Sequence, residues 1–119
     1  MKGPSRRPEQ MAETVRQVVS EALLTEVRDP RIGMVTVTHV VVSNELSWAT
    51  VSVSVMGEEA DKARALEGLR SAAGFFRSKL GKALHARVVP EVKFELDRGL
   101  EHAARINTVL AELKREDPA

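Results

Sequence analysis

Basic side chains gather in two acid-free segments of this chain, and such clusters bind polyanions. Between Gly68 and Pro90 there are five basic residues and no acid, and the segment from Met1 to Pro8 adds three more, again without an acid. The remaining residues include 10 basic and 17 acidic ones, a net charge of −7, although the whole chain carries only +1. This polarised distribution indicates a polyanionic partner approached from one side. The alternative is a solvated helix face, which is the more common origin of an isolated charge run.

We expect phosphate contacts from the five basic residues of the longer segment. Two residues near the N-terminus are expected to act as a flexible basic arm, and two further arginines are secondary candidates. In that order, the candidates are Arg70, Arg77, Lys79, Lys82 and Arg87; Arg6 and Arg7; and Arg28 and Arg31. For each of them the alternative is a side chain that only solvates its own helix face.

Catalytic patterns are not found in the sequence. His39, His85 and His102 are too far apart to form a pair with metal-ligand spacing. The chain contains no P-loop, no Gly-x-Ser-x-Gly and no dinucleotide fingerprint, and it has no cysteine to serve as a nucleophile or zinc ligand. We therefore expect no enzymatic activity, no cofactor and no metal site, and a small hydrolase is the weakest of the alternatives.

Size and composition predict one compact domain over residues 1–119, with a flexible basic segment at 1–8 and a frayed end at 115–119. With 119 residues and 43% hydrophobic positions, the chain can form one modest core. Its apolar runs are too short to span a bilayer, and its basic N-terminus lacks the apolar centre of a signal peptide. We expect a cytoplasmic protein that does not bind membranes.

Hydrophobic periodicity predicts the elements that position the basic residues. A first helix is expected from Gln10 to about Arg28 or Asp29, where Pro30 ends it. Two Val-rich and Thr-rich segments joined by a short polar link indicate an antiparallel hairpin. A long helical pattern, a third strand and a terminal helix follow. The predicted ranges after the first helix are 34–43 and 48–56 for the hairpin, 58–84 for the long helical pattern, 91–97 for the third strand and 100–113 for the terminal helix.

Glycine interrupts the long helical pattern near its middle, at Ala72-Ala73-Gly74. A glycine inside a helix costs about 1 kcal/mol relative to alanine. We therefore expect Gly74 to mark a kink or a close approach of another segment to the backbone. Phe76 and Phe94 are assigned to the core, whereas the pattern leaves Phe75 and Trp48 unassigned.

The order of these elements predicts an α+β fold with helices packed on one face of a three-stranded sheet. The third strand returns by way of the kinked helices, so we expect it to pair parallel to a hairpin strand. This order is the layout of a type II K-homology domain: helix, strand, strand, two helices joined at a kink, strand and helix.

Several segments in their order and spacing resemble one known family. They are Arg28-Asp29-Pro30-Arg31-Ile32-Gly33, Val40-Val41-Val42-Ser43 running into Leu46 and Ala49, Ala72-Ala73-Gly74-Phe75-Phe76-Arg77, and Arg87-Val88-Val89-Pro90-Glu91-Val92-Lys93-Phe94 leading into Asp97. From Arg7 to Leu113 the chain resembles the ribosome-binding factor A family. The resemblance implies a K-homology-like monomer that binds the free small (30S) ribosomal subunit. It further implies assistance in late maturation of 16S rRNA, growth in the cold and release by an assembly GTPase. Glu45 departs from the aspartate usual in the family.

The chain lacks the Gly-x-x-Gly loop with which K-homology domains hold single strands, and Ala72-Ala73-Gly74 matches the family's Ala-x-Gly instead. Tyr is absent, and the chain has one Trp and three Phe, so platforms for stacking bases are scarce. We expect recognition of folded rRNA through phosphates and 2′-hydroxyls. A second hypothesis is a protein-interaction or regulatory domain whose basic patch meets an acidic protein.

Overall fold

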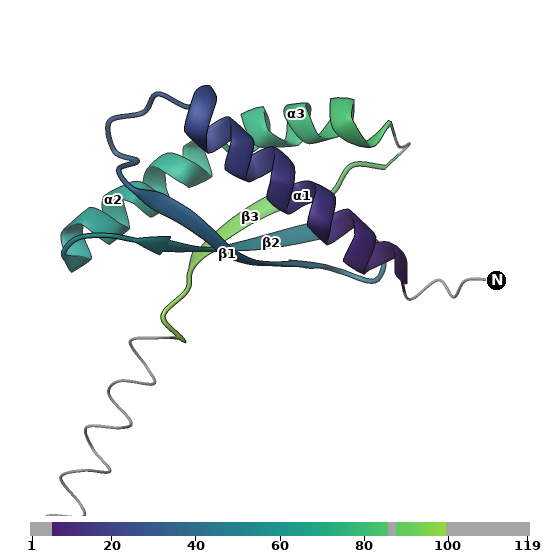
Figure 1. The fold of residues 1–119 in the computed structure, drawn as a ribbon, viewed down its shortest axis with the longest axis horizontal. Coiled ribbons are helices and arrows are strands. Elements are labelled where there is room, and N and C mark those ends of the chain that lie inside the picture. The colour runs from purple at the N-terminus through teal and green to yellow at the C-terminus, as the bar shows by residue number, and fades with distance from the viewer. Residues whose placement is uncertain (1–5, 86–87, 100–119) are drawn as a thin grey trace, which may run out of the picture.

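Three helices cover one face of a three-stranded sheet in the computed structural model, which describes residues 6–85 and 88–99 (Figure 1). This arrangement confirms the predicted α+β fold and the predicted order of elements as far as the third strand. The predicted terminal helix at 100–113 lies outside the described residues. In chain order the elements are α1 (Arg6–Thr25), β1 (Val35–Val42), β2 (Trp48–Val55), α2 (Glu59–Ser71), α3 (Ala73–Leu84) and β3 (Glu91–Leu96).

The sheet has the strand order β1-β2-β3, with β1 antiparallel and β3 parallel to β2. Both pairings were predicted from the short link and from the helical crossover. The link is closed by Ser43, whose Oγ accepts the backbone N–H groups of Ser47 at 3.0 Å and Trp48 at 3.1 Å. A bulge between Val37 and His39 shifts the register of β1. The bulge lets valines on both sides of it face the core. Val42 is part of the buried core, and Val35, Val37 and Val40 pack against it.

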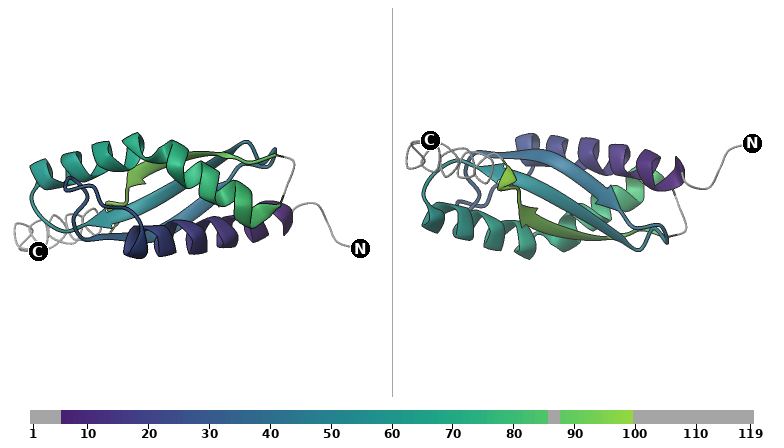
Figure 2. Two further views of the ribbon diagram at one scale, coloured as in Figure 1. Left: turned by 90° about the horizontal axis from the view of Figure 1, so that it is seen from above. Right: turned by 90° about the horizontal axis from the view of Figure 1, so that it is seen from below.

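The core lies between the sheet and the helices. Every second residue of β2 from Ala49 to Val55 is buried, and the alternate residues lie on the opposite face of the strand. Figure 2 shows the helices on one side of the sheet and the other side open. Phe76 and Phe94 are both fully buried, as predicted from the pattern. The largest fully buried side chains come from all three helices, from β2 and β3, and from the residue that precedes β3: Val15, Val19, Val51, Val53, Leu69, Phe76, Leu80, Phe94 and Pro90.

The first helix ends at Thr25, three or four residues before the predicted end at Arg28 or Asp29. The N–H groups of Glu26 and Val27 both donate to the carbonyl of Ala22, at 2.9 and 3.0 Å, so the chain has already left the helical path there. The helix also begins at Arg6, so α1 includes the last part of the segment expected to form a flexible arm. None of the described helices is long and apolar enough to cross a membrane.

The predicted kink is a break between α2 and α3 at Ala72, whose φ and ψ are −92° and 5°. Gly74 lies within α3, and a Cβ added to it would meet no atom within 4 Å. The break is thus confirmed within the expected tripeptide, but the alternative of a close backbone approach at Gly74 is wrong.

Gly68 is the glycine of this region to which another segment packs closely. A Cβ there would lie 2.8 Å from Cγ1 of Ile32 and 3.3 Å from Cβ of Arg31. The loop between α1 and β1 therefore rests directly on the backbone of α2, one turn before the break, and only glycine leaves room for it.

Candidate nucleic-acid interface

The exposed face of α3 begins directly after the break. Phe75, Ser78 and Lys82 are all exposed and are spaced by three and four residues, so they share one face of the helix. Phe76 and Leu80 are fully buried on the opposite face. Gly74 precedes this exposed row and adds no side chain to it. We call Arg70, Gly74, Phe75, Ser78 and Lys82 together the break surface.

Lys82 and Arg70 are its two cations without an intramolecular partner. Both side chains are exposed, and neither forms a hydrogen bond or ion pair within residues 6–85 and 88–99. Arg70 lies in the last turn of α2, just before the break, and Lys82 lies in the last turn of α3. Free guanidinium and ammonium groups of this kind can accept phosphate without first losing an ion pair.

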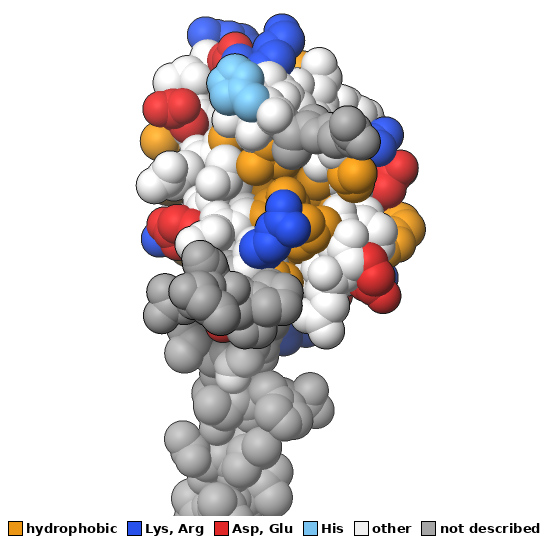
Figure 3. Space-filling model, turned by 90° about the vertical axis from the view of Figure 1, so that its right-hand side faces the viewer, with side chains coloured by type: hydrophobic (Ala, Val, Ile, Leu, Met, Phe, Trp, Pro, Cys, Tyr) orange, Lys and Arg blue, Asp and Glu red, His pale blue; other side chains and the backbone are white. Residues whose placement is uncertain are grey.

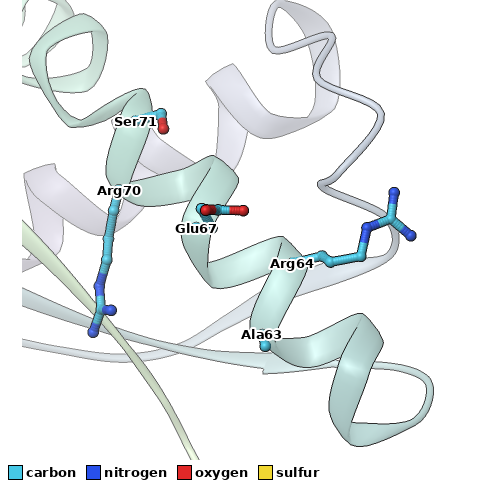
Figure 4. Close-up of a pocket in the computed structure, with 5 residues that line it drawn as sticks. All are labelled: Ala63, Arg64, Glu67, Arg70 and Ser71. Atoms are coloured by element: carbon cyan, nitrogen blue, oxygen red, sulfur yellow. The ribbon is translucent and has the colours of Figure 1, made fainter.

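A shallow depression on α2 continues the surface beyond Arg70. It is lined by Ala63, Arg64, Glu67, Arg70 and Ser71. Figure 4 shows Arg64 and Arg70 leaving the helix in different directions, with Glu67 between them. Arg64 was not a predicted candidate, because Glu67 separates it from the acid-free segment. Both arginines are exposed on α2.

Lys79 differs from Lys82 because it is bound to α1. Its Nζ lies 2.7 Å from Oε1 and 2.8 Å from Oε2 of Glu26. About a third of the Lys79 side chain is exposed. The cation is therefore neutralised by an acid that is 53 residues away in the sequence.

Arg77 is held on the other side of α3. Its Nη2 and Nε donate to the carbonyl of Val89 at 3.1 and 3.3 Å, and its Nη1 lies 3.5 Å from Oε2 of Glu91. The guanidinium thus ties α3 to the start of β3. Arg77 and Lys79 border the exposed face of α3, and both carry an intramolecular acid as partner.

The two secondary candidates in the loop after α1 also differ. Arg28 is exposed and has no partner among the described residues. Arg31 is half-buried: its Nη2 lies 2.7 Å from Oδ2 of Asp29, and its Nη1 lies 3.7 Å from Oε1 of Glu67. The hydrogen bonds from Arg31 lower the pKa of Asp29 to about 2, and Asp29 in turn raises the pKa of Arg31. Arg31 therefore serves mainly to fix the loop.

The N-terminal candidates lie at the opposite end of α1. Arg7 is exposed and lines a hollow together with Met11, Leu46, Leu84 and Val88. Figure 3 views this end of the molecule and shows hydrophobic side chains gathered around a basic one. The side chain of Arg6, and Arg87 as a whole, lie outside what the structure describes.

Metal-ligating groups are not gathered anywhere in the part of the chain that the structure describes. No group of three His, Cys, Asp or Glu residues there could hold an ion. His39 is exposed on β1, and His85 ends α3 in a left-handed conformation with φ 52°. His102 lies outside the described residues. The chemistry that this surface supports is the binding of anions by exposed cations.

Known proteins match this chain in sequence and in fold. The model of the family described as ribosome-binding factor A matches residues 7–110. The chain belongs to the ribosome-binding factor A family. The family's matching segment includes both sides of the break, the loop that rests on Gly68 and the whole of the sheet.

Individual relatives match over nearly the whole chain. Ribosome-binding factor A of Rhodopirellula baltica is 46% identical over 112 residues, covering 94% of this chain and 82% of the relative. Ribosome-binding factor A of Desulforamulus reducens is 39% identical over 113 residues, covering 95% of this chain and 94% of the relative.

Solved structures share the fold. The solution structure of a Thermotoga maritima protein assigned as a ribosome binding factor A matches with a TM-score of 0.71 and 33% identity, covering 83% of this chain and 94% of that one. A model of Thermus thermophilus ribosome binding factor A, fitted into a cryo-EM map of a 30S complex, matches with a TM-score of 0.63 and 25% identity. That alignment covers 77% of this chain and 96% of the fitted one.

Proposed function

We propose that this protein is a ribosome assembly factor that binds the free small (30S) ribosomal subunit and assists late maturation of 16S rRNA. Membership of the ribosome-binding factor A family supports the proposal, as does the placement of the Thermus thermophilus relative in a map of a 30S complex. The protein acts by stoichiometric binding and without catalysis. It works as a cytoplasmic monomer and supports growth in the cold.

The observation that carries the proposal is the pair of unpartnered cations on either side of the α2–α3 break. Arg70 and Lys82 are exposed and free of intramolecular acids within the described part of the chain, whereas Lys79, Arg77 and Arg31 are each paired. Phosphate groups bind free cations at the lowest cost, because no existing ion pair has to be broken. Arg70 and Lys82 are therefore the primary phosphate contacts. The paired cations contribute to RNA binding only through the electrostatic potential of the protein surface.

Bound protein would stabilise one arrangement of an immature rRNA region. A ligand shifts a conformational equilibrium only by the difference between its affinities for the two states. A rigid helix pair with cations on both sides of a break can provide that difference, because phosphates must lie at a matching separation. An assembly GTPase then releases the protein when the mature arrangement has formed.

Charge reversal at the break surface tests the proposal. Arg70→Glu and Lys82→Glu are each expected to lower the affinity for purified small subunits about tenfold. Each should also reduce the slope of log K against log salt concentration by about 1, because one phosphate contact is lost. Lys93→Glu is the matched control, because Lys93 is also exposed and unpartnered in the described region but lies on the open face of the sheet.

Co-sedimentation with free small subunits and with assembled ribosomes gives the readout. Preferential binding to free subunits, weakened by Arg70→Glu and Lys82→Glu but not by Lys93→Glu, supports the proposal. Equal losses in all three variants would mean that only net charge matters. Binding that persists after the RNA is digested would instead favour an acidic protein as the partner.

A further inference from the structure

Phe75 is the exposed member of the chain's three phenylalanines. Phe76 and Phe94 are fully buried, whereas Phe75 is 42% exposed in the first turn of α3. Its neighbour Gly74 has no side chain, and a Cβ there would meet nothing within 4 Å. The approach to the Phe75 ring from the side of the break is therefore open.

The ring of Phe75 contacts the core through Phe76, which in turn contacts Phe94. It meets Phe76 at a centroid distance of 5.7 Å and an interplanar angle of 70°, and Phe76 meets Phe94 at 5.3 Å and 60°. Edge-to-face pairs of this kind are favourable beyond the burial of area. An aromatic ring held in this way loses little conformational entropy when a ligand stacks on it.

Phe75 also lies on the same face of α3 as the free cation Lys82. Positions 75, 78 and 82 are related by one and two helical turns, and all three are exposed. The break surface thus combines an aromatic ring, small neighbours and an unpartnered cation. A nucleotide offers the complementary groups, a flat base and a charged phosphate.

We propose that Phe75 stacks on one unpaired base of the RNA that the break surface binds. The ligand is then RNA with at least one unstacked nucleotide next to its phosphate contacts, rather than a continuous duplex. This inference rests on the proposed function and adds a base contact to it. Trp48, which is 50% exposed, is the first residue of β2, and its side chain faces the open side of the sheet away from α3, so it provides a matched control.

Substitutions at position 75 separate stacking from general hydrophobic contact. Phe75→Leu keeps an apolar side chain but removes the π-face, and we expect it to lower the affinity for small subunits about tenfold, within the usual range for one stacked base. Phe75→Trp keeps the π-face and should bind within about twofold of the wild type, as should the control Trp48→Leu. Circular dichroism and thermal unfolding establish that each variant is folded.

Tryptophan fluorescence gives a direct readout of stacking. The double variant Trp48→Phe, Phe75→Trp carries its one tryptophan at position 75. Its emission should be quenched by an oligouridylate of about ten nucleotides and not by an abasic chain of the same length and charge. Quenching by the oligouridylate alone supports stacking, and equal quenching by both chains, or by neither, overturns it.

Failure of the stacking proposal is distinguishable from failure of the proposed function. If Phe75→Leu binds small subunits as tightly as the wild type while Lys82→Glu binds weakly, the stacking contact is refuted and the phosphate contacts stand. If the wild type does not bind small subunits at all, the proposed function itself fails. A Phe75→Trp variant as weak as Phe75→Leu, with both folded, would also refute stacking.

Discussion

Lys79 and Glu26 join α3 to the end of α1, with 2.7 Å between Nζ and Oε1. Glu26 thus supplies an acidic partner to α3, whose own sequence contains no acid. At the other end of the same loop, Ile32 packs on Gly68 of α2. The segment from Glu26 to Ile32 therefore contacts both helices across their break and holds the two at a fixed angle. Substitutions can test each of these contacts separately.

Charge reversal of Lys79 should affect stability, whereas reversal of Lys82 should affect binding. Lys79→Glu places two carboxylates together and is expected to lower the free energy of unfolding by about 0.5–1 kcal/mol, as for a partly exposed pair. The double variant Glu26→Lys, Lys79→Glu restores opposite charges and should recover most of this loss. Urea unfolding measures the effect, with Lys82→Gln as the control expected to unfold nearly like the wild type, because it removes a charge without placing an acid in the last turn of α3. A Lys79→Glu variant of unchanged stability would contradict the structural role of this pair.

Alanine at Gly68 and at Gly74 should act in opposite directions. Gly68→Ala forces Ile32 and Arg31 away from α2 and is expected to cost about 1–3 kcal/mol, as overpacking does. Gly74→Ala meets no atom and should stabilise α3 by up to about 1 kcal/mol through helix propensity. Chemical unfolding of the two variants is the measurement. Equal effects of both substitutions would show that the loop does not rest on Gly68.

Ionisation of Asp29 should make the free energy of unfolding depend on pH in the acid range. Its pKa is about 2 in the folded protein against an ordinary value of 3.8, because Arg31 donates hydrogen bonds to the carboxylate. A lowered pKa means that the ionised form stabilises the fold above about pH 4, and that this contribution is lost as the pH falls toward 2.

The variant Asp29→Asn isolates this contribution from the other acids. The amide side chain of this variant cannot ionise, so the variant should be less stable than the wild type at about pH 7, and the difference should shrink between about pH 4 and pH 2. Unfolding midpoints over that pH range are the test. A difference that stays constant across the range would show that the carboxylate charge is not what fixes the loop.

The basic segment shows how far local sequence predicts this site. The five cations between Gly68 and Pro90 could be located and counted, and the positions of Arg70, Arg77, Lys79 and Lys82 on α2 and α3 followed from helical spacing. Their partners could not be predicted, because Glu26 and Glu91 belong to other elements. The selection of Arg70 and Lys82 over Arg77 and Lys79 therefore depends on contacts between distant segments.

The glycines of α2 and α3 show the same limit of local sequence for the fold. A break near Ala72 was predictable, since Gly74 weakens a helix wherever it stands. Of the two alternatives expected at Gly74, the kink is confirmed and the close approach is not found there. The close approach occurs at Gly68 and could not be predicted, because helix propensity is a local property and the approach of Ile32 to Gly68 is not.

Hydrophobic period and charge are carried by neighbouring residues, so the sequence alone was enough to locate the strands and helices that the structure describes, the buried side of each and the basic segments. The three-dimensional fold was needed to show which of the described cations are unpaired, that Phe75 is exposed while Phe76 is buried, and that the loop after α1 spans the break. These features depend on which residues meet across the fold, where a single ion pair such as that of Lys79 with Glu26 removes a free cation from the exposed surface.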